Sequence, residues 1–234
     1  MRQLLHPFAA GDLPAMLPVA ASTIHRLERV LRLPAGAPLI LNDGRGRRVE
    51  VRWRGAHFEV VGAPVQAPAA ERFIELAAAL IKGERFDWLV EKCTELGVDR
   101  LVPLQTDHCV VQLDARRGAE KAERWRAIAR ESLEQCGRDC LPEISTPTPL
   151  LRWLGEGQGP LFHADERGAP VALAQALTPG PGQVRIVIGP EGGLSVAERL
   201  QIEAVGGQAV TLGRNVLRAE TAAIFAVGLA RNTP

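Results

Sequence analysis

Two glycine-rich segments near the carboxyl end of the chain combine room for a ligand with side chains that can do chemistry. They are residues 189–194, which read GPEGGL, and residues 213–218, which read GRNVLR. Glycine lacks a Cβ and takes positive φ without strain, so such loops let the backbone approach a ligand closely. Glu191 lies in the first loop and Arg218 ends the second. Both segments are therefore candidate ligand loops.

Each loop follows a short apolar run, as expected after a buried parallel strand. The runs are 184–188 and 208–212, and we predict that these strands end side by side, at the edge where open α/β sheets bind ligands. The first loop has neither the Lys-Ser/Thr ending of a phosphate loop nor the dinucleotide pattern G-x-G-x-x-G. The expected ligand is therefore neither an ordinary nucleoside triphosphate nor NAD. A third loop follows the short strand 161–163, which ends at His163.

The second part of the chain alternates strands and helices that can position these loops. An apolar strand at 73–81 precedes a helix whose apolar residues, from Phe86 to Leu96, fall at helical spacing and which stops at Gly97. This spacing places Cys93 in the core. A strand at 98–104 completes a βαβ unit and predicts a parallel sheet. Further helices are expected at 119–136, from the capping box of Ser195 and Glu198 to about 204, and at 219–231.

The first part of the chain indicates a small β-barrel with a basic face. A turn at 42–46 joins apolar residues 39–41 to an alternating segment, 49–53, and a further strand is expected at 57–61. Residues 25–32 predict a short helix. Residues 63–70 contain two prolines and predict a linker. We therefore expect two domains, residues 1–68 and residues 69–234.

Composition bounds the partners and the compartment. Residues 1–70 hold nine arginines, no lysine and five acidic residues, a net charge of +4, against −3 for the rest of the chain. Such a module suggests a polyanionic partner, although a solvated arginine-rich surface is the alternative. Without an apolar run of about 20 residues or a signal-peptide core, we expect a soluble, cytoplasmic protein that does not enter membranes. The four cysteines have no C-x-x-C pairing, so free thiols are expected and no metal site is predicted.

Five motifs in order resemble one known family. The segments HRLERVLRLPAGAPLILNDGRG, KGERFDWLVEKCTELGV, EQCGR, IGPEGGLS and LGRNVLRAETA are similar to the ribosomal RNA small subunit methyltransferase E family of the SPOUT superfamily, and the resemblance covers nearly the whole chain. Its amino-terminal segment resembles the family's PUA-like domain. Two departures stand out: Ala164-Asp165 replaces a usual Pro-Glu, and Cys136 replaces a common serine. The first leaves the contact of that loop in doubt.

The resemblance implies a fold and an activity beyond what spacing shows. It implies an α/β fold with an amino-terminal PUA-like β-barrel and a carboxyl-terminal SPOUT domain that has a parallel sheet and a trefoil knot. It also implies a homodimer that binds S-adenosylmethionine in the knot. The reaction it implies is methylation of N3 of one uridine, uridine 1498, in 16S ribosomal RNA of the small ribosomal subunit.

The resemblance and the loops together indicate site residues of two kinds. The expected cofactor-binding residues are His163, Ile188, Gly189, Pro190, Gly192, Gly193, Leu212, Gly213, Asn215, Val216, Leu217 and Ala222. The expected RNA-binding residues are Arg29, Arg32, Arg45, Arg47, Arg48 and Arg138. The helix start at Ser195 is expected to favour the cofactor's carboxylate through the helix dipole.

Methylation at uracil N3 requires loss of a proton and stabilisation of the charge that spreads to O2 and O4. Arg218 is expected to stabilise that charge, and Glu191 or Glu220 to take the proton. Structural alternatives stay open: Glu220 caps the last helix, Arg218 pairs with it, and Glu191 holds its loop.

Other functions also fit parts of the sequence. A ribose 2′-O-methyltransferase of the same superfamily would use the same cofactor site. A non-catalytic RNA-binding or ribosome-assembly factor needs only the basic module. A metabolic enzyme could bind a small anion at residues 189–193, but it would not need the arginine-rich segment.

Overall fold

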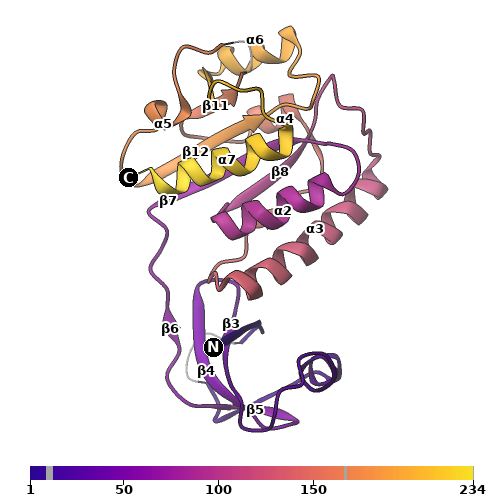
Figure 1. The fold of residues 1–234 in the computed structure, drawn as a ribbon, viewed down its shortest axis with the longest axis vertical. Coiled ribbons are helices and arrows are strands. Elements are labelled where there is room, and N and C mark those ends of the chain that lie inside the picture. Colours follow the sequence, from indigo (N-terminus) through magenta and orange to yellow (C-terminus); the bar gives the residue numbers. More distant parts are fainter. Residues whose placement is uncertain (9–12, 166–167, 234) are drawn as a thin grey trace. The chain divides into compact units, whose positions relative to one another are not determined.

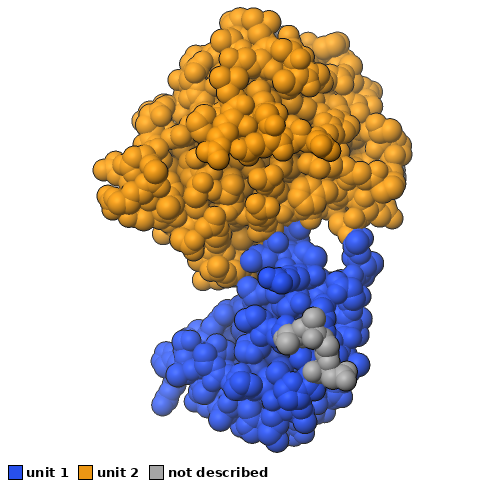
Figure 2. All heavy atoms as spheres, turned by 180° about the vertical axis from the view of Figure 1, so that it is seen from behind, with its two compact units in different colours: residues 1–69, 133–141 blue, residues 70–132, 142–234 orange. Residues whose placement is uncertain are grey.

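The computed structural model describes residues 1–8, 13–165 and 168–233. The chain forms two compact units, coloured separately in Figure 2. Unit 1 consists of Met1–Ala69 and Leu133–Leu141, and unit 2 consists of Ala70–Ser132 and Pro142–Pro234. None of the helices in the described part of the chain has the length and apolar character that a membrane crossing requires. The four cysteines are free thiols.

Unit 1 is built on a six-stranded sheet. Its strands are β1 (Arg2–Leu5), β2 (Met16–Pro18), β3 (Pro38–Asn42), β4 (Arg47–Trp53), β5 (His57–Val60) and β6 (Val65–Gln66). The expected hairpin is β3 and β4, with Leu41 opposite Val49. Along β4, Val49, Val51 and Trp53 are buried and the residues between them are exposed, which is the alternation that one covered face requires. The short helix begins at Ala21, earlier than expected, as α1 (Ala21–His25), and continues as the π-helical turn η1 (Arg26–Val30).

The sheet of unit 1 is not a closed barrel in the described residues. Its strand order is β1-β3-β4-β5-β2, with β6 beside β4, so β1 and β2 are its two ends. The expected linker also contains a strand. β5 pairs with β4 at residues 51–53 only, which leaves Arg47 and Arg48 without a neighbour on that side, and β6 pairs with these two residues instead. The linker forms a strand because the backbone groups of β4 need partners.

Residues 133–141 belong to unit 1, whereas the sequence analysis placed them in the second domain. The backbone carbonyl of Arg138 accepts hydrogen bonds from the amides of Gln3, at 2.6 Å, and Asn42, at 3.0 Å. The backbone N–H of Leu141 donates to the carbonyl of Gly44 at 2.8 Å. These contacts join residues about a hundred positions apart, and no local sequence pattern signals such a pairing.

Unit 2 is an α/β fold with a parallel sheet, as predicted (Figure 1). The sheet has seven strands. Its strands are β7 (Arg72–Ala79), β8 (Arg100–Gln105), β9 (Glu143–Ile144), β10 (Thr148–Pro149), β11 (Leu161–Ala164), β12 (Gly182–Ile188) and β13 (Gln208–Val210). Its helices are α2 (Arg85–Leu96), α3 (Ala115–Cys136, whose last residues lie in unit 1), α4 (Leu150–Leu154), α5 (Leu173–Ala176), α6 (Val196–Ala204) and α7 (Ala219–Asn232). Helix α7 packs over β7 and β12, and α2 packs beside α7.

Local predictions in unit 2 are confirmed where a stop or cap signal exists. Gly97 ends α2 in the left-handed region at φ 97°, and Cys93 is completely buried. The capping box of Ser195 and Glu198 is present at the start of α6. Helix α3 begins at Ala115, before the expected residue 119.

The order of the strands differs from the prediction at one place. Strands β12 and β13 do not end side by side, because β11 lies between them. His163 in β11 is opposite Val187 on one side and Ala209 on the other. A four-residue strand with both faces buried fills this position, and its local sequence carries no information about its neighbours. Three strand ends therefore meet at this edge, and the predicted third loop, after His163, starts between the other two.

A cluster of buried charged side chains links α4 to the sheet through hydrogen bonds. Glu75 in β7 is 1% exposed and accepts hydrogen bonds from Arg185 Nε at 3.0 Å, Trp153 Nε1 at 2.7 Å and Arg100 Nη1 at 3.1 Å. Arg185, itself 3% exposed, also donates to the backbone carbonyl of Trp153 at 2.8 Å and lies 4.0 Å from the centre of its ring. The two buried charges, Glu75 and Arg185, pair with each other, and each forms further hydrogen bonds. Burial of both charges is therefore tolerated.

Replacing Glu75 by Gln is expected to lower the free energy of unfolding by about 3–5 kcal/mol, because the buried charge of Arg185 then loses its partner. Glu143→Gln is the matched control: Glu143 lies 3.6 Å from the same Arg100 but is 66% exposed, and such a pair contributes about 0–1 kcal/mol. Urea unfolding followed by circular dichroism measures both. Equal losses in the two variants would contradict this account of the cluster.

Candidate active site

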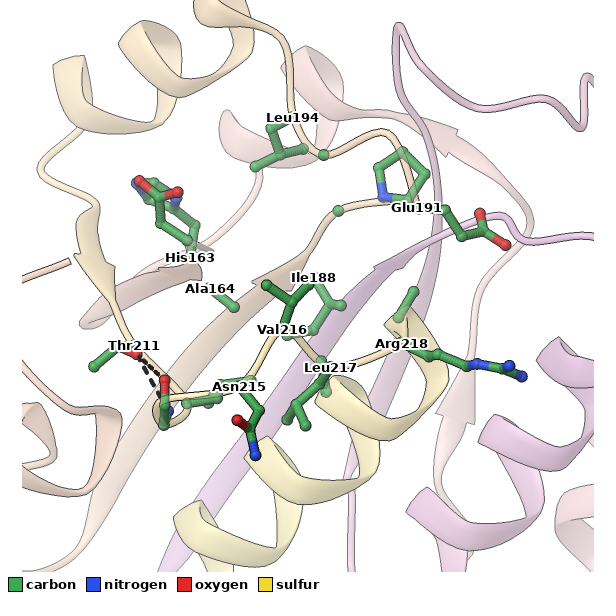
Figure 3. A pocket seen from close by; sticks show the side chains of 18 of the residues that line it. His163, Ala164, Ile188, Glu191, Leu194, Thr211, Asn215, Val216, Leu217 and Arg218 are labelled. Carbon is green, nitrogen blue, oxygen red and sulfur yellow. Dashed lines mark hydrogen bonds between the residues drawn. The ribbon is translucent and has the colours of Figure 1, made fainter. Parts of the chain in front are cut away.

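Three loops at the carboxyl ends of β11, β12 and β13 enclose a cavity of about 540 Å³ in unit 2 (Figure 3). Its lining consists of residues that end these strands or lie in the loops, together with the first turns of α6 and α7. They are His163, Ala164, Asp165, Gly168, Ile188, Gly189, Pro190, Glu191, Gly193, Leu194, Arg199, Thr211, Leu212, Gly213, Arg214, Asn215, Val216, Leu217, Arg218, Ala219 and Ala222. The cavity therefore lies at the sheet edge that the sequence predicted.

The lining includes most of the residues expected at the site. Only Gly192 among the expected cofactor residues and Glu220 among the expected catalytic residues are outside it. Several charged or polar lining residues are not among the expected site residues. These are Asp165, Arg199, Thr211 and Arg214. Arg199 lies in α6, and its guanidinium donates to the backbone carbonyl of Leu194, another lining residue.

His163 brings unused hydrogen-bonding capacity to one end of the cavity. Its side chain is 1% exposed, and neither ring nitrogen has a hydrogen-bond partner among the described residues. Burial lowers the pKa of His163 below its ordinary value; the nearby charges of Asp165 and Glu203 oppose this effect, and Arg199 adds to it. A neutral imidazole offers one donor and one acceptor. A ligand in the cavity can satisfy them.

Glu191 and Arg218 occupy the other end of the cavity. Their side chains extend to the side away from His163 (Figure 3). Arg218 is the residue before α7, and its side chain has no ion pair or hydrogen bond within the described ranges. Glu191 is bound by Arg85, whose Nη2 lies 2.6 Å from its Oε1. Arg218 is thus left to interact with a ligand, and it does not pair with Glu220.

Glu220 is buried behind the cavity. It is 5% exposed, and its Oε2 lies 3.8 Å from Arg85 Nη1. That oxygen has no hydrogen-bond partner in the part of the chain that the structure describes. Glu191, which lines the cavity, is therefore better placed than Glu220 to meet a ligand.

The glycine loop is held by contacts from the segment after β8. His108 Nδ1 lies 3.1 Å from the carbonyl oxygen of Gly192 and 3.0 Å from that of Gly193. A Cβ on Gly192 would come within 3.2 Å of the His108 Cβ, so close packing against His108, and not the cavity, accounts for this glycine. Gly193 faces the cavity with φ 69°. The sequence analysis did not find this role of His108, which no local pattern reveals.

The start of α6 does not face a ligand as expected. Ser195 Oγ donates to Asp107 Oδ2 at 2.6 Å, and Glu198 accepts from the backbone N–H groups of Ser195 at 2.8 Å and Asp107 at 2.9 Å. Ser195 is not among the lining residues. Two carboxylates of the chain itself already occupy the position at which the helix dipole would favour an anion.

The six arginines expected to bind RNA all belong to unit 1. Arg29, Arg32, Arg45 and Arg48 are exposed, and Arg47 and Arg138 are half-buried. The guanidinium of Arg47 lies 5.4 Å from the centre of the Phe8 ring, and Arg48 lies 3.7 Å from Asp139. Arg32 has φ 49°, a left-handed conformation uncommon for a residue with a side chain.

Similarity to known proteins shows both the class of protein and the family to which this chain belongs. The family model described as an RNA methyltransferase domain matches residues 69–231. The ribosomal RNA small subunit methyltransferase E of Mycobacterium tuberculosis is 34% identical over 213 residues, covering 85% of this chain and 79% of the relative. That of Bacillus subtilis is 27% identical over 222 residues, covering 89% and 87%. The chain therefore belongs to the ribosomal RNA small subunit methyltransferase E family of RNA methyltransferases, which confirms the resemblance of its motifs.

Solved structures agree with this assignment. The ribosomal RNA small subunit methyltransferase E of Neisseria gonorrhoeae, bound to S-adenosyl methionine, has a TM-score of 0.85 at 25% identity and covers 97% of this chain and 95% of that chain. A protein of Legionella pneumophila in complex with the bound cofactor SAM has a TM-score of 0.86 at 28% identity, covering 96% and 94%.

The burial of His163 predicts a pH dependence of stability. Because its folded pKa lies below the ordinary value of about 6.5, the unfolded chain binds a proton that the folded chain does not. The free energy of unfolding should therefore fall as pH drops below about 6.5, by at most about 1.4 kcal/mol per pH unit from this group. Urea unfolding at pH values above and below this point should show a smaller loss in His163→Asn than in wild type. An identical pH dependence in the two proteins would contradict a lowered pKa of His163. Burial also lowers the pKa of His6, but both proteins contain His6, so its effect cancels in the comparison.

Proposed function

We propose that this protein transfers a methyl group from S-adenosylmethionine to N3 of a uridine in 16S ribosomal RNA, by resemblance uridine 1498. The observation that carries the proposal is the cavity formed by the loops after β11, β12 and β13 in a chain of this family. Its volume of about 540 Å³ lies within the range of sites for small molecules and cofactors, about 300–1,000 Å³.

The residues of the cavity fit such a cofactor. Glycine backbone and the apolar side chains of Ile188, Leu194 and Leu217 would hold adenine and ribose. The two ring nitrogens of His163 have no hydrogen-bond partner among the described residues, and a polar group of the cofactor would form hydrogen bonds with them. The remaining residues proposed to bind the cofactor are Gly189, Pro190, Gly193, Leu212, Gly213, Asn215, Val216 and Ala222, with Gly192 shaping the loop.

When bound, S-adenosylmethionine supplies a methyl group on a positively charged sulfur; as the N3–C bond forms, the S–C bond breaks and its electron pair stays on sulfur. The protein's own part is positioning and charge control. Arg218, whose guanidinium is free to reach a ligand, would stabilise the charge that spreads to O2 and O4 of uracil. Glu191 would accept the N3 proton and pass it to solvent. Glu220 would have an indirect part in the reaction, because it does not line the cavity.

The arginines of unit 1 are proposed to contact phosphates of the RNA, in the free molecule or in the small subunit. The exposed Arg29, Arg32, Arg45 and Arg48 are the principal candidates, with Arg47 and Arg138 beside them in the same unit. We assign a PUA-like character to this unit and a knotted topology to the loops of unit 2 by the same resemblance. The cytoplasm is the compartment in which such a substrate would be met.

The function can be tested first by cofactor binding. Calorimetric titration with S-adenosylmethionine is expected to give micromolar affinity for the wild-type protein and no detectable binding for Gly193→Trp, whose side chain would fill the cavity. Gly206→Trp is the matched control, because Gly206 also has positive φ, 84°, but a Cβ there meets open space outside the cavity. Loss of binding in both variants would contradict the placement of the cofactor.

The reaction is then tested on RNA. Small ribosomal subunits that lack the modification are incubated with protein and cofactor. Their nucleosides are separated by liquid chromatography and identified by tandem mass spectrometry, which shows whether the methyl group is on the base or on the ribose. N3-methyluridine supports the proposal, whereas 2′-O-methyluridine would assign the ribose reaction instead. No product with a protein that binds the cofactor would contradict methyl transfer to this RNA.

We propose a homodimer that uses an apolar groove beside α7. The groove is lined by Leu96, Ile224, Phe225, Gly228, Leu229, Asn232 and Thr233. Phe225 is 43% exposed, which is costly for a large aromatic side chain unless a partner covers it. Sedimentation equilibrium should give twice the chain mass of 25.3 kDa, and Phe225→Glu should shift it towards the monomer. A wild-type mass of one chain at assay concentration would contradict the dimer.

A further inference from the structure

One arginine outside the cavity contacts both glutamates that the reaction could use. Arg85 is the first residue of α2, and its guanidinium lies 2.6 Å from Glu191 Oε1 through Nη2 and 3.8 Å from Glu220 Oε2 through Nη1. Its Nε donates to the backbone carbonyl of Lys82 at 3.3 Å. Arg85 therefore joins three segments of unit 2: the loop after β7, the glycine loop after β12 and the first turn of α7.

The two glutamates differ in how much they depend on this contact. The side chain of Glu220 is 6% exposed, and its Oε2 lacks a hydrogen-bond partner among the described residues, so Arg85 is the cation that offsets its buried charge. The side chain of Glu191 is 43% exposed and lies in a loop, where water could solvate it in many orientations. For Glu191 the contact selects one orientation, next to the cavity.

The chemistry of this position favours arginine. A guanidinium presents several N–H donors in a fixed plane and so can face two carboxylates at once, whereas an ammonium is a single point charge on a flexible stem. The base of the side chain is also fixed, because the next residue of α2, Phe86, is 2% exposed in the core. Arg85 thus connects a rigid helix to the side chain of Glu191, whereas His108 contacts the loop at the backbone of Gly192 and Gly193.

We propose that Arg85 is a positioning residue of the methyl-transfer site. It holds the carboxylate of Glu191 beside the cavity and, through Glu220, fixes the first turn of α7 and with it Arg218, the residue that precedes this helix. The inference rests on the proposed function, because it assigns Arg85 an effect on the same reaction. Arg85 does not itself line the cavity.

The test compares Arg85→Gln and Arg85→Lys with Arg152→Gln, a control that removes an arginine from another ion pair of unit 2, that with Glu156 at 3.0 Å. Arg85→Gln is expected to lower kcat for methyl transfer by about tenfold to a hundredfold, since misplaced catalytic groups cost rates of this order. Arg85→Lys should recover part of that loss, and Arg152→Gln should leave kcat unchanged. KM for S-adenosylmethionine should change by less than about threefold in all three, because Arg85 does not contact the cofactor cavity.

A double-mutant cycle shows whether Arg85 acts through Glu191. Glu191→Gln alone should lower kcat, and adding Arg85→Gln should then cost less than it does in the wild-type protein, since only the route through Glu220 to Arg218 is left to lose. Independent, multiplying losses would overturn the proposal, as would a kcat for Arg85→Gln within twofold of wild type. If Arg85→Gln does not fold, Arg85→Lys with Glu191→Gln completes the cycle.

Hydrogen exchange separates this inference from the proposed function. Peptides that contain residues 189–193 should exchange faster in Arg85→Gln than in wild type, and not in Arg152→Gln, because the loop loses one of its side-chain contacts. This readout needs no substrate. Unchanged exchange would overturn the role of Arg85 even if the protein methylates RNA, whereas faster exchange in a protein without methyltransferase activity would contradict only the proposed function.

Discussion

The parallel pairing of β11 with both β12 and β13 is the constraint on which the site depends. His163 lies opposite Val187 and Ala209, so the carboxyl ends of the three strands meet at one edge. Each end continues into a loop, and a cavity forms because the three loops start close together and diverge. A shift of β11 by one residue would turn His163 to the opposite face of the sheet and remove its imidazole from the lining.

Much of the local structure could be predicted, because stop and cap signals act over a few residues. Gly97, the capping box at Ser195 and the alternation along β4 each specify an element by themselves. The position of β11 between two later strands could not be predicted, since it depends on which strands pair and not on the composition of any of them. The strand in the linker was missed for a related reason: Val65 and Gln66 form a strand only because Arg47 and Arg48 have unpaired backbone groups.

The site shows the same division. The loop residues could be identified because glycines and charged residues next to apolar runs are visible in the sequence. Arg85 and His108 could not, since each acts on a loop about a hundred or eighty residues away in the chain. Chemistry at Glu191 and Arg218 can be guessed from residue type, but the contacts that leave Arg218 unpaired and bind Glu191 are products of tertiary packing.

The chain passes between the two units three times, after residues 69, 132 and 141. The smaller unit therefore consists of two separate segments of the chain, and recombination at a single position in the gene could not transfer it whole. A fragment ending at Ala69 would leave the amides of Gln3 and Asn42 without the Arg138 carbonyl, and the backbone N–H of Gly46 without that of Asp139. A gene fusion that borrowed the first unit would need a substitute for residues 133–141. With this topology the two units are expected to be inherited together, because neither can easily be exchanged for an unrelated domain.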